Sequence, residues 1–201
     1  MSKSQAVNGV IRKIPAWPIY IGFALWAAWM FYRGITGSLG VEPVERLEQT
    51  YGDMALKLVI LGLAVTPFRK WTKINLLKFR RAIGVTTFFL VLAHFMVWAV
   101  LDVQSLSRVW ADIVERWHIT VGIFAMLLML PLVVTSNDFS LRKIGGMGWR
   151  KLHKLTYPAA ILAGLHWVVL VKGFQIEPLV YMAIIVALLA TRIKWRPRKA
   201  A

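Results

Sequence analysis

Long uncharged stretches alternate with short charged connections along this chain. Four such stretches cover residues 14–32, 82–101, 117–137 and 155–171. A helix needs about 20 mainly apolar residues to cross the hydrocarbon core of a bilayer, where every backbone polar group must be paired internally. The four stretches therefore predict transmembrane helices. The first is rich in tryptophan and no small-residue cleavage site follows it, so it is predicted to be a retained span rather than a signal peptide.

Two shorter apolar stretches predict two more spans. One ends at Arg69 and reaches back to residue 54 if the Lys57 ammonium extends to the membrane surface, and the other covers 178–191. The predicted fold is all-α: a polytopic membrane helical bundle, one domain over residues 1–201. Its six transmembrane helices are expected at about 14–32, 54–69, 82–101, 117–137, 155–171 and 178–191.

Charged residues are unevenly divided among the connections. Nineteen of the 25 lysines and arginines fall before residue 14, in 69–81, in 142–154 or after Thr191, and eight of the nine acidic residues fall in the other connections. Cytoplasmic segments carry the excess of Lys and Arg, so both termini are predicted to be cytoplasmic in a bacterial inner membrane. The basic residues behind the net charge of +16 lie in short segments between apolar runs rather than on one solvated surface. This arrangement favours membrane lipid as a partner and argues against nucleic acid.

The first outer connection, residues 34–53, alternates acidic and aliphatic residues weakly between positions 41 and 48. This pattern indicates either a short surface helix or a merely solvated face, and the solvated face is the favoured interpretation.

Composition narrows the possible chemistry. The mean hydropathy is +0.61 and the chain has no cysteine. Without cysteine there are no disulfides, iron–sulfur clusters or thiolate ligands, and no attachment site for covalent c-type haem. Any haem must be held without a covalent bond.

Two of the four histidines lie inside predicted spans. His94 is expected roughly 18 Å from the cytoplasmic end of its helix, and His166 reaches a comparable depth in the 155–171 span. Two imidazoles at one level on different helices can bind one iron from opposite faces. Each could instead be a structural residue bonded to a neighbouring helix carbonyl. Haem ligation is favoured because ionisable residues in a membrane are costly to bury and usually functional.

The other two histidines are expected near the membrane surfaces. His153, at the cytoplasmic mouth of the fifth span, could ligate a second haem or be one more basic residue at the headgroups. On a continuous helix, its 13-residue separation from His166 puts the two roughly 140° apart, unless Pro158 kinks the helix. His118 is interpreted as an interfacial residue.

Two arginines stand at the start of the third span. Arg81 could pair with a haem propionate or another anion because its guanidinium matches a carboxylate. Arg80 is better explained by the positive-inside bias.

Several motifs resemble one family. These are RRAIG at 80–84 followed by His94, WRKLHKLTY at 149–157 and GLH at 164–166. They resemble the haem-binding membrane subunit of the bacterial periplasmic methionine sulfoxide reductase system, the MsrQ (YedZ) family. The likeness extends to 40–43, 66–67 and 119–122. More broadly, the chain resembles the ferric-reductase-type transmembrane domain also found in NADPH oxidases.

The resemblance implies an electron-transfer subunit with no catalytic site of its own. It would pass electrons from respiratory quinone through haem b to a periplasmic molybdopterin-containing subunit, in a heterodimer that repairs oxidised methionine. The expected cofactor is one haem b held by His94 and His166, or two if His153 also ligates iron, with Arg81 as a further cofactor contact. FMN is a possible second kind of cofactor that the resemblance alone implies. No phosphate-cradling glycine-rich loop in the sequence supports it.

The sequence departs from the broader pattern at one point. Where an NADPH oxidase carries a second histidine on its third helix, Arg80 and Arg81 stand here, so a haem at His153 would lack its usual opposite ligand. The alternatives are a ferric or oxygen reductase working with a separate flavoprotein, and a non-redox scaffold or transporter. Transporters commonly have internal repeats and buried acidic residues, which this sequence lacks.

Overall fold

The computed structural model describes residues 3–171 and 174–193, and these form helices and turns without any strand. The predicted all-α class is confirmed. The α-helices are α1 (Lys3–Lys13), α2 (Trp17–Ile35), α3 (Pro43–Thr72), α4 (Arg80–Met96), α5 (Leu106–Glu115), α6 (Trp117–Val134), α7 (Asp138–Leu152), α8 (Thr156–Leu170) and α9 (Ile176–Ala190). The 3-10 turns η1 (Leu77–Phe79) and η3 (His153–Leu155) precede α4 and α8, and the π-helix η2 (Val97–Val103) extends α4.

Three helical segments are long and apolar enough to cross a membrane: α3, the continuous Leu77–Val103 segment, and α6. Residues 4–13 and α2 would together make a fourth, bent by 68°. The apolar helices α8 and α9 have 15 residues each. The described part of the chain therefore has the helices of a membrane protein.

Helix α3 begins at Pro43, well before the predicted start of the second span, so much of the expected outer connection is helical. Proline suits the first turn of a helix because its missing N–H needs no partner there. Leu47 and Tyr51, one turn apart, are buried against α2, and the Tyr51 hydroxyl donates a hydrogen bond to the Ala27 carbonyl at 2.7 Å. The solvated face favoured for this region was therefore wrong.

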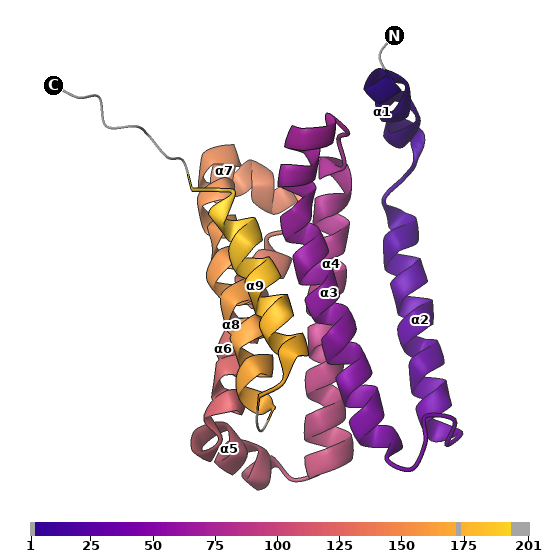
Figure 1. The fold of residues 1–201 in the computed structure, drawn as a ribbon, viewed down its shortest axis with the longest axis vertical. Helices are drawn as coiled ribbons and strands as arrows, with labels where there is room; N and C mark the ends of the chain where they lie inside the picture. Colours follow the sequence, from indigo (N-terminus) through magenta and orange to yellow (C-terminus); the bar gives the residue numbers. More distant parts are fainter. Residues whose placement is uncertain (1–2, 172–173, 194–201) are drawn as a thin grey trace, which may run out of the picture.

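The basic segments of the described chain gather at one end of the molecule. Figure 1 shows α1, the α3–α4 connection, α7 and the end of α9 together at the top, and α5 at the bottom. The basic residues from Lys194 onward lie outside the described residues.

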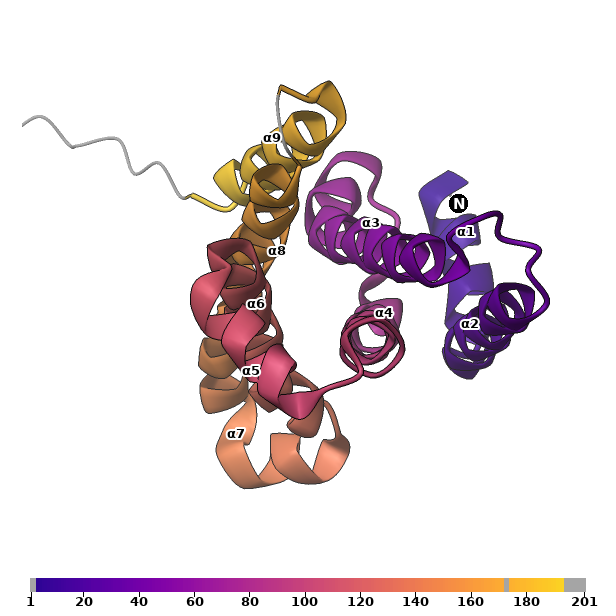
Figure 2. The same ribbon diagram turned by 90° about the horizontal axis from the view of Figure 1, so that it is seen from below.

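Two closely packed helix pairs form the frame of the site. Helix α3 packs along α4, α6 packs along α8, and α9 covers α8 (Figure 2). Small residues permit the close approach of α8 to its neighbours: Ala160 is buried with Leu63 of α3 and Ile185 of α9. The α3–α4 and α6–α8 pairs meet less closely, and two cavities lie between them.

Candidate functional site

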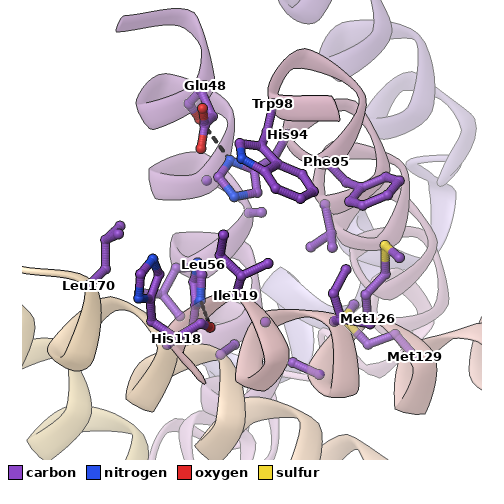
Figure 3. Close-up of a pocket in the computed structure, with 18 of the residues that line it drawn as sticks. Glu48, Leu56, His94, Phe95, Trp98, His118, Ile119, Met126, Met129 and Leu170 are labelled. Carbon is purple, nitrogen blue, oxygen red and sulfur yellow. Dashed lines mark hydrogen bonds between the residues drawn. The ribbon is translucent and has the colours of Figure 1, made fainter. Parts of the chain in front are cut away.

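The cavity nearer α5, here called the outer cavity, has a volume of about 280 Å³. The four helices that enclose it place histidines and glycines on its wall: Gly52 from α3, His94 from α4, His118 and Gly122 from α6, and His166 from α8. Most of the remaining wall is apolar or aromatic, including Leu56, Phe95, Trp98, Met126 and Met129 (Figure 3). The cavity therefore presents His94, His118 and His166 on a mostly apolar wall that also includes Glu48, Asp102 and Arg116.

The structure brings His94 and His166 together. Their ring centres are 6.3 Å apart and the ring planes are inclined at 78°. Metal–imidazole bonds measure about 2.0 Å and the ring centre lies about 1.1 Å beyond the nitrogen, so imidazoles on opposite sides of one iron have centres roughly 6 Å apart. The observed separation fits such a pair.

A backbone carbonyl of another helix fixes each of these two rings. The Nδ1 atom of His94 lies 2.9 Å from the Glu48 carbonyl oxygen on α3, and Nδ1 of His166 lies 2.7 Å from the His118 carbonyl oxygen on α6. A carbonyl oxygen can only accept, so Nδ1 carries the proton in both rings. Each Nε2 therefore keeps a lone pair, which is the form of imidazole that binds a metal.

The donor set fits haem better than a bare metal ion. Within residues 3–171 and 174–193, no group of three or more His, Cys, Asp or Glu side chains comes together to hold an ion. Two imidazoles are insufficient for a protein-only site, but they complete the coordination of an iron that already has four porphyrin nitrogens. The outer cavity thus suits an apolar, planar iron compound.

A second hollow, here called the inner cavity, lies nearer α7 and has a volume of about 740 Å³. It adjoins the outer cavity at Val59 and Met129, which line both. Its wall carries the cationic residues Lys78, Arg80, Arg81, Arg150 and Lys154 together with His153.

His153 is held mainly by a carbonyl one turn earlier along the chain, with a further contact from the α6–α7 connection. Its Nδ1 donates to the Trp149 carbonyl at 3.0 Å, and its ring stacks on the Trp149 indole with centres 3.7 Å apart. Its Nε2 lies 3.4 Å from the Ser136 hydroxyl. The 3-10 turn η3 separates α7 from α8. The angle predicted between His153 and His166 assumed one continuous helix, and that helix is absent. The structure does not bring His153 to the outer pair.

Arg81 lines the inner cavity but also pairs with an acidic residue. Its Nη1 lies 2.6 Å from Oδ1 of Asp138 at the start of α7. This hydrogen bond and the guanidinium charge hold the pKa of Asp138 below its usual value. Part of the positive charge at this end of the cavity is thereby neutralised.

From the sequence, a bond from each central ring to a neighbouring helix carbonyl is an alternative to ligation. The structure shows such bonds, but the sequence does not indicate which carbonyls make them. The accepting atoms belong to the backbone, so the identities of Glu48 and His118 gave no signal for this role. His118 was expected at the interface, and its side chain also lines the outer cavity.

The sequence of this chain is similar to one protein family and to several named relatives. Residues 51–164 match the family described as "Ferric reductase like transmembrane component". Relatives named "Protein-methionine-sulfoxide reductase heme-binding subunit MsrQ" from Brucella ovis, Brucella canis and Brucella suis are each 43% identical over 178 residues, which is 88% of this chain and 80% of the relative. No solved structure matches significantly.

Proposed function

We propose that this chain, which belongs to the MsrQ family of ferric-reductase-like transmembrane proteins, is a membrane b-type cytochrome that delivers electrons to a periplasmic methionine sulfoxide reductase. The relatives carry haem binding in their names, and the family is one of transmembrane components. In this role the chain would support the repair of oxidised periplasmic proteins indirectly, because its partner would carry the site for methionine sulfoxide.

One observation carries this proposal: the approach of His94 and His166 in the outer cavity, with ring centres 6.3 Å apart and each Nδ1 proton already engaged by a carbonyl. These two residues would hold the haem iron through their Nε2 atoms. Bound haem supplies one-electron oxidation and reduction. The chain itself keeps both rings in the ligating tautomer and surrounds them with apolar side chains, which limits the access of water.

The proposed orientation follows the charge distribution. We place the basic end with α1 and α7 in the cytoplasm and the α5 end in the periplasm, with six helices (α2, α3, α4, α6, α8 and α9) crossing a bacterial inner membrane as one domain. The outer cavity then lies near the periplasmic face. A molybdopterin-containing partner, in a heterodimer with this chain, would take electrons there, and respiratory quinone would supply them.

The inner cavity is the proposed place for any further cofactor. A second haem would have His153 as its histidine ligand, with Arg81 and its cationic neighbours available to the propionates. The same cations would suit the phosphate of FMN. Haem stoichiometry and flavin fluorescence of the purified protein separate these assignments.

Purification in detergent tests the proposal directly. The protein should be red, with a Soret band that shifts when the oxidised sample is reduced by dithionite, and that shifts in the same direction when a separate oxidised sample receives a quinol. His94→Ala and His166→Ala should each abolish the low-spin ferric signal, because one imidazole cannot fill both axial positions. His153→Ala should leave the low-spin signal of the outer pair intact. A colourless wild-type protein, or unchanged spectra in both outer variants, would refute the proposal.

A further inference from the structure

The two central histidines are seated in the same way, although they lie on different helices. Each ring donates through Nδ1 to a carbonyl of the adjacent helix, and a glycine follows that carbonyl by four positions. On α3 the carbonyl belongs to Glu48 and the glycine is Gly52, whereas on α6 they are His118 and Gly122. In an α-helix the N–H of residue i+4 points at the carbonyl of residue i, so the glycine lies beside the accepting oxygen.

Both imidazoles occupy the space that a side chain would take at these glycines. A Cβ at Gly52 would stand 3.1 Å from Nδ1 and 3.2 Å from Cε1 of His94. A Cβ at Gly122 would stand 2.8 Å from Nδ1 and 3.0 Å from Cε1 of His166. In each case the nearest atom is the nitrogen that makes the hydrogen bond, so any larger residue would push the ring away from its carbonyl.

Neither glycine is required by its backbone conformation. Both lie inside helices, and the positive-φ glycines of the described residues are Gly37, Gly40 and Gly145. Glycine inside a helix is unfavourable by roughly 1 kcal/mol relative to alanine. Its presence at two equivalent positions needs another reason, and contact with the ring supplies one.

We propose that Gly52 and Gly122 are positioning residues: their missing side chains let His94 and His166 lie against α3 and α6, so that the Glu48 and His118 carbonyls fix both the tautomer and the direction of each ring. This inference rests on the proposed function, because the rings are positioned for iron. In this proposal, the orientation of each histidine ring depends on a carbonyl and a glycine of a helix other than the one that carries the histidine.

Alanine substitution tests this role. Gly122→Ala should have the larger effect because its contact with Nδ1 is below 3.0 Å, and Gly52→Ala the smaller. Both should shift the largest g value of the ferric low-spin EPR signal and the reduction potential, because both quantities respond to the Nδ1 hydrogen bond and ring orientation. Transfer of haem to apomyoglobin should be faster by about 10- to 100-fold in Gly122→Ala, the usual cost of losing a group that orients a metal ligand.

Two other glycines provide matched controls. Gly62 is also on α3, and its Cβ would meet only Ile83 at 3.6 Å, an ordinary contact. Gly164 on α8 is as crowded as Gly52, with Ile185 at 3.0 Å and Met182 at 3.3 Å, but it touches neither imidazole. Gly62→Ala should match wild type in EPR signal, reduction potential and haem transfer, and its thermal midpoint should be unchanged or slightly higher, because alanine is the better helix former. Gly164→Ala should lower the thermal midpoint while keeping the wild-type EPR signal.

The outcomes separate this inference from the proposed function. A wild-type protein without a low-spin haem would overturn the function before any glycine variant is made. A wild-type protein with that signal, but with EPR spectra and haem transfer unchanged in Gly122→Ala and Gly52→Ala, would overturn only the positioning role. Equal EPR shifts in Gly164→Ala would overturn it too, since helix crowding alone would then suffice. If Gly122→Ala does not accumulate, the milder Gly52→Ala decides by the same comparison with Gly164→Ala.

Discussion

The outer and inner cavities each contain histidine, but their histidines are held in opposite ways. In the outer cavity, His94 and His166 donate to carbonyls on helices remote in sequence, and their ring centres are 6.3 Å apart. In the inner cavity, His153 donates to Trp149 one turn earlier in its own helix and stacks on the same residue. The outer rings therefore depend on the assembled bundle, whereas the inner ring is fixed by local structure.

The surroundings of the two cavities differ as well. Apolar and aromatic side chains dominate the outer wall, while cations gather on the inner wall at the basic end of the molecule. A buried pair of neutral imidazoles suits an electron carrier that must stay in a dry environment. A cationic pocket with one histidine suits an anionic group instead. We therefore propose His94 and His166, which have each other as partners and carbonyls of other helices to orient them, as stronger candidate ligands than His153.

The largest expected change comes from giving the inner cavity a second imidazole. Arg80 lies on α4, lines the inner cavity with His153 and precedes His94 on the same helix. Arg80→His should add haem to the purified protein, or convert an inner haem to the low-spin form, because two imidazoles can then share one iron. The pyridine haemochromogen assay gives the haem content and EPR gives the spin state.

Arg80→Gln is the matched control, because it removes the cation without adding a ligand. Equal haem content and equal spin states in Arg80→His and Arg80→Gln would show that the inner cavity cannot accept a paired ligand. The shape of the inner cavity, rather than the lack of a second histidine there, would then explain why the two cavities differ.

A smaller effect is expected at His118, whose backbone and side chain play different parts. The bond to His166 uses the His118 carbonyl, which remains in any substitution that keeps α6 helical. His118→Ala should therefore retain haem and the low-spin signal, with at most a small shift in reduction potential from the altered cavity wall. Haem content and potentiometric titration check this. Loss of the low-spin signal would mean that the imidazole of His118 is itself a ligand.

The sequence predicted the elements of this fold better than their ends. Apolar length predicted a helix at each of the six expected spans, and α3, the Leu77–Val103 segment and α6 are long and apolar enough to cross a membrane, but it placed the start of α3 too late and did not predict α1, α5 or α7. The segment around Leu47 and Tyr51 buries its apolar face on α2 rather than in lipid. A hydropathy pattern does not distinguish these two surroundings.

The candidate site was predictable in part. Depth along two helices predicted that His94 and His166 could meet, because the rise per residue of a helix is fixed. The carbonyls of Glu48 and His118 were not predictable, since every residue has one and only the packing of helices selects which is used. The break between His153 and His166 was anticipated only as a possible kink at Pro158, and the structure has the 3-10 turn η3 just before that proline, which lies in the first turn of α8.

The smallest expected effect concerns the ion pair at the inner cavity. Arg81 lowers the pKa of Asp138, so this pair contributes stability above the ordinary carboxyl pKa, near 3.9, and loses that contribution as the pH falls through the lower, folded value. Both side chains are substantially exposed, at 36% and 70%, which keeps the contribution small. Asp138→Asn should therefore lower the thermal midpoint slightly at pH 7, and the difference from wild type should shrink as the pH is lowered toward 3. A difference that grows on acidification would show that Asp138 is not stabilised by Arg81, and the inner cavity would then hold one more uncompensated cation than the structure indicates.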